Sequence, residues 1–254
     1  MIVIYKEEGW EVITQRAHGI VAAQLAAQWK ASHRPERWLE TILAIAEHDD
    51  AENELDGETL ITEAGGPLNF AMKNFDLEKC RKLASLTITK SRYIALLSSM
   101  HMTFLYEKDA ASDAKAKAFL KEQSALQRKW RTELSLSDEE ALRIYDLVEW
   151  CDALSLLICK GDMQPEERRL EISMGPDKKK YYLVQTGEDV LSVDPWPFEG
   201  KGFWVNFEYR TLNQVQFRSS ADFRALFIAS TPAEKKWRLA PLTKKGLKTK
   251  ASKL

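Results

Sequence analysis

The feature that most constrains this chain is a change in the spacing of its apolar residues at about residue 165. Up to Lys160 the apolar side chains recur every three or four positions, which is typical of amphipathic helices. Beyond Pro165 the chain breaks into short segments rich in Val, Tyr and Phe, separated by Gly, Pro, Asp and Asn, which is typical of antiparallel strands. The pattern therefore predicts an α+β chain with helices first and strands afterwards.

Local signals place the individual elements. Residues 2–6 and 10–14 are rich in β-forming residues and flank Glu7-Glu8-Gly9, so a short hairpin should come first. Helices should follow around His18, at 38–49, 67–73, 76–86, 91–107, 113–133 and 137–159, the last opened by a Ser137/Glu140 capping box. Strands should then cover 169–174, 180–185, 190–193, 203–211 and 213–217.

These elements predict two domains and a tail. A helical domain with its N-terminal hairpin should span 1–163, and an antiparallel β module should span 164–243. Residues 244–254 hold five lysines and no acid, which predicts a mobile tail. The segment 195–198 should form a rigid aromatic clip between the β module and the helices, with a recognition surface as the alternative.

Composition excludes several classes of protein. Apolar residues make up 44% of the chain and charged residues 30%, which is an ordinary globular balance. The longest apolar stretch, Ala153–Cys159, is far shorter than the ~20 residues that span a bilayer. The net charge is −1, so no overall field favours nucleic acid as a partner. The apolar start of the chain is interrupted by the charged residue Lys6, which is unlike a secretion signal. The three cysteines lack metal-binding spacing and favour a reducing, cytoplasmic location.

The scarcity of histidine makes its placement informative. The chain has four histidines, and His18, His48 and His101 fall on or beside the apolar stripes of three different helices. The fourth, His33, lies in a chain break and serves as an internal comparison. A single inward histidine is usually a hydrogen-bonded core residue, so the set of three carries more weight than any one of them.

Two aspartates share these inward positions and suggest a metal ion. Asp49 and Asp152 fall on apolar helix faces, where an ionised carboxylate costs several kcal/mol unless it is paired. A divalent cation shared with neutral imidazoles would compensate both, and nitrogen-plus-carboxylate donors suit Zn, Mn, Fe or Ni. The run Glu47–Glu58 also holds seven acids and no Lys or Arg near a helix C-terminus, where the macrodipole disfavours negative charge. A structural polar network remains the alternative.

Part of this acidic run has a second interpretation. Residues 52–63 partly match a calcium-binding loop, although Glu52 stands where Asp is usual and Thr59 where an aliphatic residue is usual. The acidic loop is more simply explained as a solvated segment.

The histidines and aspartates also resemble a known motif. His18, the adjacent pair His48-Asp49 and then Asp152 are similar to the H…HD…D pattern of the HD superfamily, all-helical proteins of which many are metal-dependent phosphohydrolases. More narrowly, the chain resembles a bacterial family of unknown function that opens with Met-Ile-Val. The resemblance continues in the segments Thr14–His18, Ala44–Asp50, Cys151–Leu156 and Asp194–Phe198. In that family Gly-Trp follows the His-Asp-Asp triplet, whereas this chain has Ala51-Glu52.

The resemblance implies a fold and a site. The fold would be an HD-like, all-helical main domain, preceded by a short β-hairpin and followed by a small antiparallel β module. The metal would be held by His18, His48, Asp49 and Asp152, with His101 as a further ligand or a substrate contact. HD-type oxygenases hold two irons and use more histidines than this chain supplies, so one ion is expected unless Glu47 or Asp50 contributes a ligand.

A function follows as a hypothesis. A divalent ion would lower the pKa of a bound water from about 15.7 toward about 7 and polarise a phosphoryl oxygen, so the chain would hydrolyse a small phosphorylated, nucleotide-like compound. Positive side chains should then contact the substrate, and Arg16, Lys90 and Arg92 are the candidates. The alternatives are a non-catalytic binding or scaffold protein, whose inward polar residues lock helix packing, and an HD-type oxygenase, which would hold iron tightly.

Overall fold

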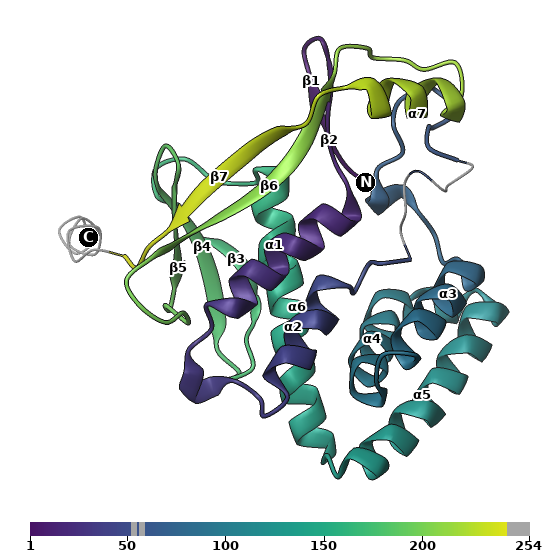
Figure 1. Cartoon of the computed structure of the whole chain (residues 1–254), viewed down its shortest axis with the longest axis vertical. Coiled ribbons are helices and arrows are strands. Elements are labelled where there is room, and N and C mark those ends of the chain that lie inside the picture. Colours follow the sequence, from purple (N-terminus) through teal and green to yellow (C-terminus); the bar gives the residue numbers. More distant parts are fainter. Residues whose placement is uncertain (52–54, 56–58, 243–254) are drawn as a thin grey trace.

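The computed structural model describes residues 1–51, 55 and 59–242 (Figure 1). Its helices are α1 (Gln15–Ala27), α2 (Trp38–Ala46), α3 (Leu77–Ile88), α4 (Arg92–Tyr106), α5 (Ala114–Leu134), α6 (Asp138–Lys160) and α7 (Ser220–Ala229). Its strands are β1 (Ile2–Lys6), β2 (Gly9–Ile13), β3 (Leu170–Met174), β4 (Lys180–Gly187), β5 (Val190–Asp194), β6 (Phe203–Leu212) and β7 (Ala233–Leu239). Short 3-10 turns lie at Ala31–His33, Phe70–Met72 and Asp109–Ala111.

One seven-stranded sheet joins the two ends of this sequence. The strand order is β1-β2-β6-β7-β5-β4-β3, and every neighbouring pair is antiparallel except β5 and β7, which run parallel. The N-terminal hairpin enters this sheet because β2 pairs with β6, with Trp10 opposite Leu212 and Val12 opposite Arg210. Gly9 permits this contact, since a Cβ there would lie 1.9 Å from the carbonyl oxygen of Leu212.

This sheet overturns the expected fold class. An HD-like, all-helical main domain with a small separate β module is wrong, because the described part of the chain is a mixed α/β structure with a curled sheet spanning much of it. Local residue patterns predicted both hairpin strands correctly. They carried no information about the pairing of β2 with β6, which lies about 200 residues away in the sequence. The division at residues 163 and 164 remains a prediction, and the tail at 244–254 lies outside the described residues.

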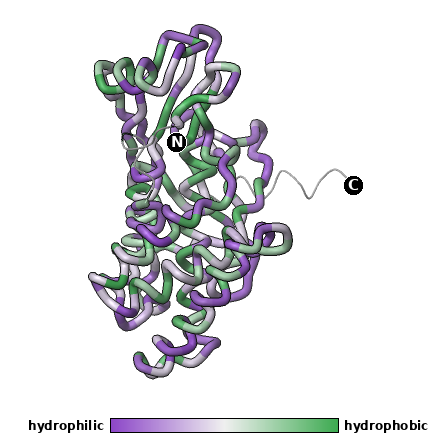
Figure 2. Tube along the Cα trace, turned by 90° about the vertical axis from the view of Figure 1, so that its right-hand side faces the viewer, coloured by the Kyte–Doolittle hydropathy of each residue, from purple (hydrophilic) through white to green (hydrophobic). Residues whose placement is uncertain are grey.

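The helices form two groups around the sheet. Helices α1 and α6 lie across it, whereas α3, α4 and α5 stand together on the side of α6 away from β4 and β5 (Figure 1). Local signals set their ends: Ser137 and Glu140 form the expected capping box of α6, and Asp113 accepts hydrogen bonds from the first backbone N–H groups of α5. In Figure 2 the hydrophilic segments concentrate at the outer turns and the hydrophobic ones run through the interior.

A shared core connects the helices to the strands. Its buried residues include Ile13 of β2, Leu25 of α1, Leu191 of β5 and Val205 of β6, so both ends of the chain contribute. At its centre, Trp150 of α6 is fully buried, and its rings contact those of three aromatic residues that come from both halves of the chain. Ring centroids lie 5.0 Å from Trp29, 5.3 Å from Tyr181 and 5.9 Å from Phe198.

The segment Asp194–Phe198 links the strands to the end of α1. Phe198 packs against Trp29 at a centroid distance of 6.0 Å, and the backbone N–H of Lys30 donates to the carbonyl of Pro197 at 3.2 Å. Glu199 N–H donates to the carbonyl of Gln28 at 2.7 Å. The expected aromatic clip is therefore present, and it holds α1 in the position from which its histidine meets the other helices.

Candidate metal centre

Four structural elements bring the five predicted ligand residues together. His18 comes from α1, His101 from α4 and Asp152 from α6, while His48 and Asp49 occupy the turn that follows α2. The three histidines are 0–2% exposed, and Asp152 is 8% exposed. Such burial of titratable groups from separate helices requires that they compensate one another or share a cation.

A close approach of α1 to the end of α2 makes this cluster possible. A Cβ placed on Gly19 would lie 2.5 Å from the carbonyl oxygen of Ala46 and 4.0 Å from Cε1 of His48. Because glycine has no side chain, the backbone of α1 can approach the turn that carries His48. The rings of His18 and His48 then meet edge to face, with centroids 4.8 Å apart.

Replacing Gly19 with alanine should separate these two elements. We expect a loss of ~1–3 kcal/mol in the free energy of unfolding, since an added methyl in a packed contact forces the backbone to shift. Urea denaturation measures the change. Ile20→Ala is the control, because the Ile20 side chain is 55% exposed on the same helix. Equal stability of the two variants would contradict the role assigned to Gly19.

The inner atoms of the cluster face each other at short range. His18 Nε2 lies 3.0 Å and His48 Nε2 3.6 Å from Asp49 Oδ2. His48 Nε2 lies 3.3 Å from Asp152 Oδ1, and His101 Nε2 lies 4.0 Å from Asp152 Oδ2. All three imidazoles thus direct Nε2 toward carboxylate oxygens.

Outer partners determine where the protons sit on two of these rings. His48 Nδ1 is 2.7 Å from the carbonyl oxygen of Ile45, which only accepts, so Nδ1 carries the hydrogen. His18 Nδ1 is 3.0 Å from Ser155 Oγ, and that hydroxyl already donates its hydrogen to the Asp152 carbonyl at 2.8 Å. His18 Nδ1 is therefore also protonated, and both neutral rings would direct an Nε2 lone pair at a carboxylate.

A nitrogen lone pair and a carboxylate oxygen repel each other, so this arrangement requires a positive charge between them. Either two extra protons or one divalent ion would balance Asp49 and Asp152. His48 Nε2 is buried and makes no hydrogen bond within the described part of the chain, although Asp152 Oδ1 is only 3.3 Å away. Two ligands that each lie about 2.1 Å from an ion are about 3.0–3.4 Å apart, close to the separations seen between His18, His48 and the two carboxylates.

The pKa values follow from this crowding. Burial would lower the pKa of His48, but the Asp49 and Asp152 carboxylates outweigh it and raise that pKa to about 10. Burial opposes ionisation of Asp49 and Asp152, yet the neighbouring imidazoles hold the pKa of each carboxyl below its usual range. Burial and the adjacent His48 lower the pKa of His101 to about 4, so His101 is neutral near neutral pH.

Two triplets within the cluster have the spacing of metal ligands. His18, His48 and Asp49 offer donor atoms within 4.8 Å of one another, and so do His48, His101 and Asp152. His48 belongs to both triplets and offers only one inward nitrogen. The two triplets therefore cannot each hold a separate ion through His48.

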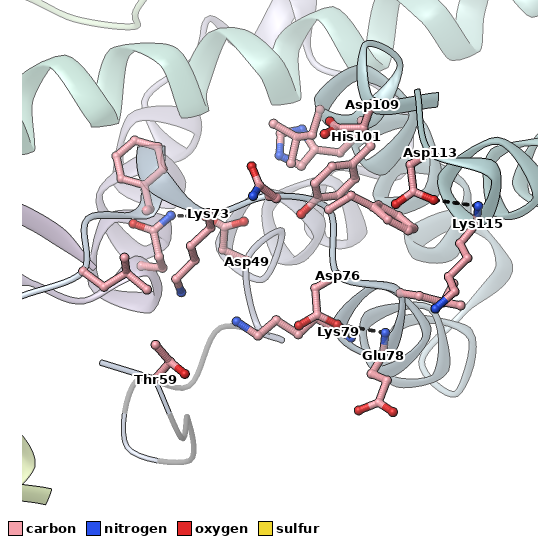
Figure 3. A pocket seen from close by; sticks show the side chains of 18 of the residues that line it. Asp49, Thr59, Lys73, Asp76, Glu78, Lys79, His101, Asp109, Asp113 and Lys115 are labelled. Carbon is pink, nitrogen blue, oxygen red and sulfur yellow. Dashed lines mark hydrogen bonds between the residues drawn. The ribbon is translucent and has the colours of Figure 1, made fainter. Parts of the chain in front are cut away.

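The cluster opens onto a cavity of about 990 Å³. Asp49, His101 and Asp152 line it, whereas the buried His18 and His48 do not. Figure 3 shows Asp49 and His101 on one side, Asp76 and Lys79 opposite, and Asp113 and Lys115 at a third edge. A small ligand in the cavity would therefore reach the carboxylate side of the cluster.

The candidate substrate contacts lie elsewhere. Arg16 pairs with Asp50 at 3.1 Å, Lys90 with Glu47 at 2.6 Å and Arg92 with Glu133 at 2.9 Å, and none of the three lines the cavity. Lys73, Lys79 and Lys115 line it instead, and sequence reasoning missed them. No periodic signal marks these lysines, because Lys73 follows a 3-10 turn and the other two begin helices. Half of the residues in the calcium-type interpretation at 52–63 lie outside the described residues.

Reasoning from sequence also missed Gln15. Its amide nitrogen donates to Asp49 Oδ2 at 2.8 Å, so Gln15 fixes the carboxylate that His18 faces. Gln15 opens α1 directly after the cap residue Thr14, whose side chain accepts from Ala17 N–H. Its position one turn before His18 is the signal that would have placed both side chains on one helix face.

The fold and the site together define a mixed α/β protein in which helices hold a buried histidine–aspartate cluster against a cavity. The family model described as "Protein of unknown function (DUF3891)" matches residues 1–214. The chain belongs to that family, and the matched region includes all five residues of the cluster. No curated protein and no solved structure matches the chain.

The expected membership of a family of unknown function is confirmed by this match. The match supports the family of unknown function, and similarity to the HD superfamily is not shown. Within the described residues, every helix is too short or too polar to cross a membrane.

Proposed function

We propose that this protein is a metal-dependent hydrolase of small phosphorylated compounds, with one divalent ion held by His18, His48, Asp49 and Asp152. The observation that carries the proposal is the environment of His48 Nε2. That atom is buried, has no hydrogen-bond partner in the described residues, and lies within 3.6 Å of two carboxylates. A cation satisfies the nitrogen and both acids at once.

The donor chemistry narrows the choice of ion. Two imidazole nitrogens and two carboxylate oxygens suit Mn, Zn, Fe or Ni better than Mg or Ca, which prefer oxygen alone. When bound, such an ion supplies Lewis acidity to water and to a phosphoryl oxygen.

The chain's own residues orient the donors and admit the substrate. The Ile45 carbonyl and Ser155 fix the rings of His48 and His18, in the way that outer partners orient metal-binding histidines. Gln15 holds Asp49. The cavity beside Asp49 and Asp152 is large enough for a small metabolite, and among the described residues six acids and three lysines line it. A bound divalent ion would therefore have to supply much of the positive charge that a phosphorylated substrate needs.

A non-catalytic binding or scaffold protein is the second candidate, and one observation favours it. A pKa of about 10 means that His48 can carry the balancing charge as an imidazolium near neutral pH. Because that pKa lies above the unfolded value of 6.5, the associated stability is fully present below pH 6.5 and is lost as the pH rises through about 10. On this alternative the cluster locks α1, the α2 turn and α6 together without an ion.

Metal analysis separates the two candidates. Protein purified without added metal or a histidine tag should contain about one equivalent of a transition metal. It should hydrolyse at least one member of a phosphomonoester and phosphodiester panel, and a chelator should abolish that activity and lower the melting temperature. Metal-free protein that neither binds added cations nor loses stability with a chelator would contradict the proposal.

Proton release gives an independent check. Since His48 must surrender its Nε2 proton to become a ligand, metal binding near neutral pH should release about one proton per ion from this residue. Affinity should therefore increase with pH and level off above about 10. Calorimetry in two buffers of different ionisation enthalpy measures the released protons. Binding without proton release would show that His48 is not a ligand.

A further inference from the structure

His101 differs from the other two histidines in its surroundings. Among the described residues, His101 is the histidine that lines the cavity, whereas His18 and His48 do not line it. Its Nε2 is 4.0 Å from the nearest Asp152 oxygen, compared with 3.0 Å for His18 to Asp49 and 3.3 Å for His48 to Asp152. The ring therefore stands farther from the acids and closer to any bound substrate.

The outer partner of His101 also differs. His48 Nδ1 meets a carbonyl oxygen, and His18 Nδ1 meets a hydroxyl whose hydrogen is already donated to the Asp152 carbonyl, so both Nδ1 atoms are protonated. His101 Nδ1 instead lies 3.3 Å from the hydroxyl of Tyr145, which can either donate or accept. Tyr145 is 7% exposed, and its pKa is raised by burial and the nearby carboxylates, so the phenol keeps its proton.

Hydrogen-bond accounting favours donation by Tyr145. If its hydroxyl accepted from His101 Nδ1–H, the phenol hydrogen would have no acceptor at this buried position among the described residues, and His101 would direct a lone pair toward Asp152. If the hydroxyl donates, Nδ1 is the acceptor and Nε2 carries the hydrogen, directed toward Asp152 and the cavity. The second arrangement gives the phenol hydrogen an acceptor and leaves the Nε2 hydrogen available toward the cavity, with Asp152 Oδ2 4.0 Å away.

We propose that His101 is not a metal ligand but a hydrogen-bond donor to the substrate, with Tyr145 as the positioning residue that keeps the hydrogen on Nε2. This inference rests on the proposed function. The Nε2–H group lies at the cavity wall beside Asp152, where it would donate to an oxygen of a phosphoryl group bound at the ion. A fixed donor of this kind stabilises negative charge that develops on the substrate.

Substitutions at His101 test this role against that of a ligand. His101→Leu should retain the metal content of the parent, and its kcat for a phosphoester should fall about 10²–10³-fold with a smaller change in KM. His101→Gln keeps an N–H donor and should recover part of that loss. His48→Gln is the matched control and should lose the metal. Metal loss in both His101 variants equal to that in His48→Gln would overturn the proposal.

Nitrogen-15 NMR of the imidazoles tests the proton position directly and needs no activity. His101 in the metal-free parent should show the spectrum of the Nε2–H form, and Tyr145→Phe should shift it toward a mixture of both forms. An Nδ1–H form in the parent would overturn the inference even if the protein binds metal. If the parent shows the Nε2–H form but neither binds metal nor hydrolyses phosphoesters, the proposed function fails instead.

Discussion

The His48→Ala protein should bind divalent transition metals at least ~100-fold more weakly than the parent. Loss of a residue that only orients a ligand already costs about 10–100-fold in affinity, and removal of the ligand itself should cost more. His48 Nε2 is the nitrogen closest to both Asp49 and Asp152 together, so no neighbouring group can replace it. Competition with a chromophoric chelator measures the two dissociation constants.

His33→Ala is the matched control for this experiment. His33 is exposed in a 3-10 turn, and its ring nitrogen contacts only Ser32 at 2.9 Å among the hydrogen bonds described. Its substitution should leave the affinity unchanged. Equal affinities for His48→Ala and the parent, with both proteins folded by circular dichroism, would remove His48 from the site.

The Trp150→Ala protein should be ~3–5 kcal/mol less stable than the parent, which is the cost typical of truncating a buried tryptophan. Trp150 is 0% exposed and contacts rings from the segment after α1, from β4 and from the Asp194–Phe198 segment, so its loss leaves a cavity lined by rings that cannot easily move in. Urea denaturation followed by far-ultraviolet circular dichroism measures the free energy of unfolding.

Trp204→Ala provides the comparison. Trp204 lies on β6 with 60% of its surface exposed, so its truncation should change the free energy of unfolding by only about 0.5 kcal/mol. If Trp150→Ala cost no more than Trp204→Ala, the aromatic contacts between α6 and the strands would not be the centre of the core.

Much of the local structure could be predicted from residue patterns. The hairpin, the capping box at Ser137 and the helices at 92–106 and 114–134 follow from short-range signals that the structure reproduces. Two elements were missed. Helix α7 opens at the cap residue Ser219, whose side chain accepts from Asp222 N–H, a recognisable start signal that was overlooked. Strand β7 contains three consecutive charged residues, Glu234 to Lys236, which interrupt the alternation typical of a strand, whereas the sequence pattern predicts a strand at 213–217.

The global arrangement could not be predicted in the same way. Strand pairing between β2 and β6 joins segments about 200 residues apart, and side-chain periodicity records only which face of a strand is buried. The five cluster residues could be predicted because burying acidic and histidine side chains costs free energy unless they are paired, and that argument is independent of the fold. The cavity lysines could not be predicted, because a lysine on the surface and a lysine on a cavity wall have the same local sequence pattern.

The pairing of β2 with β6 also determines when the sheet can form during synthesis of the chain. When the ribosome has produced the hairpin and all helices through α6, β2 still lacks its neighbour, because β6 begins at Phe203. Until then the hairpin has an open edge, and the apolar faces of α1 and α6 that later meet the strands remain wet. A nascent chain of this kind should need shielding by chaperones until roughly four-fifths of it has emerged, and a premature stop before β6 should yield an aggregating fragment rather than a working helical half.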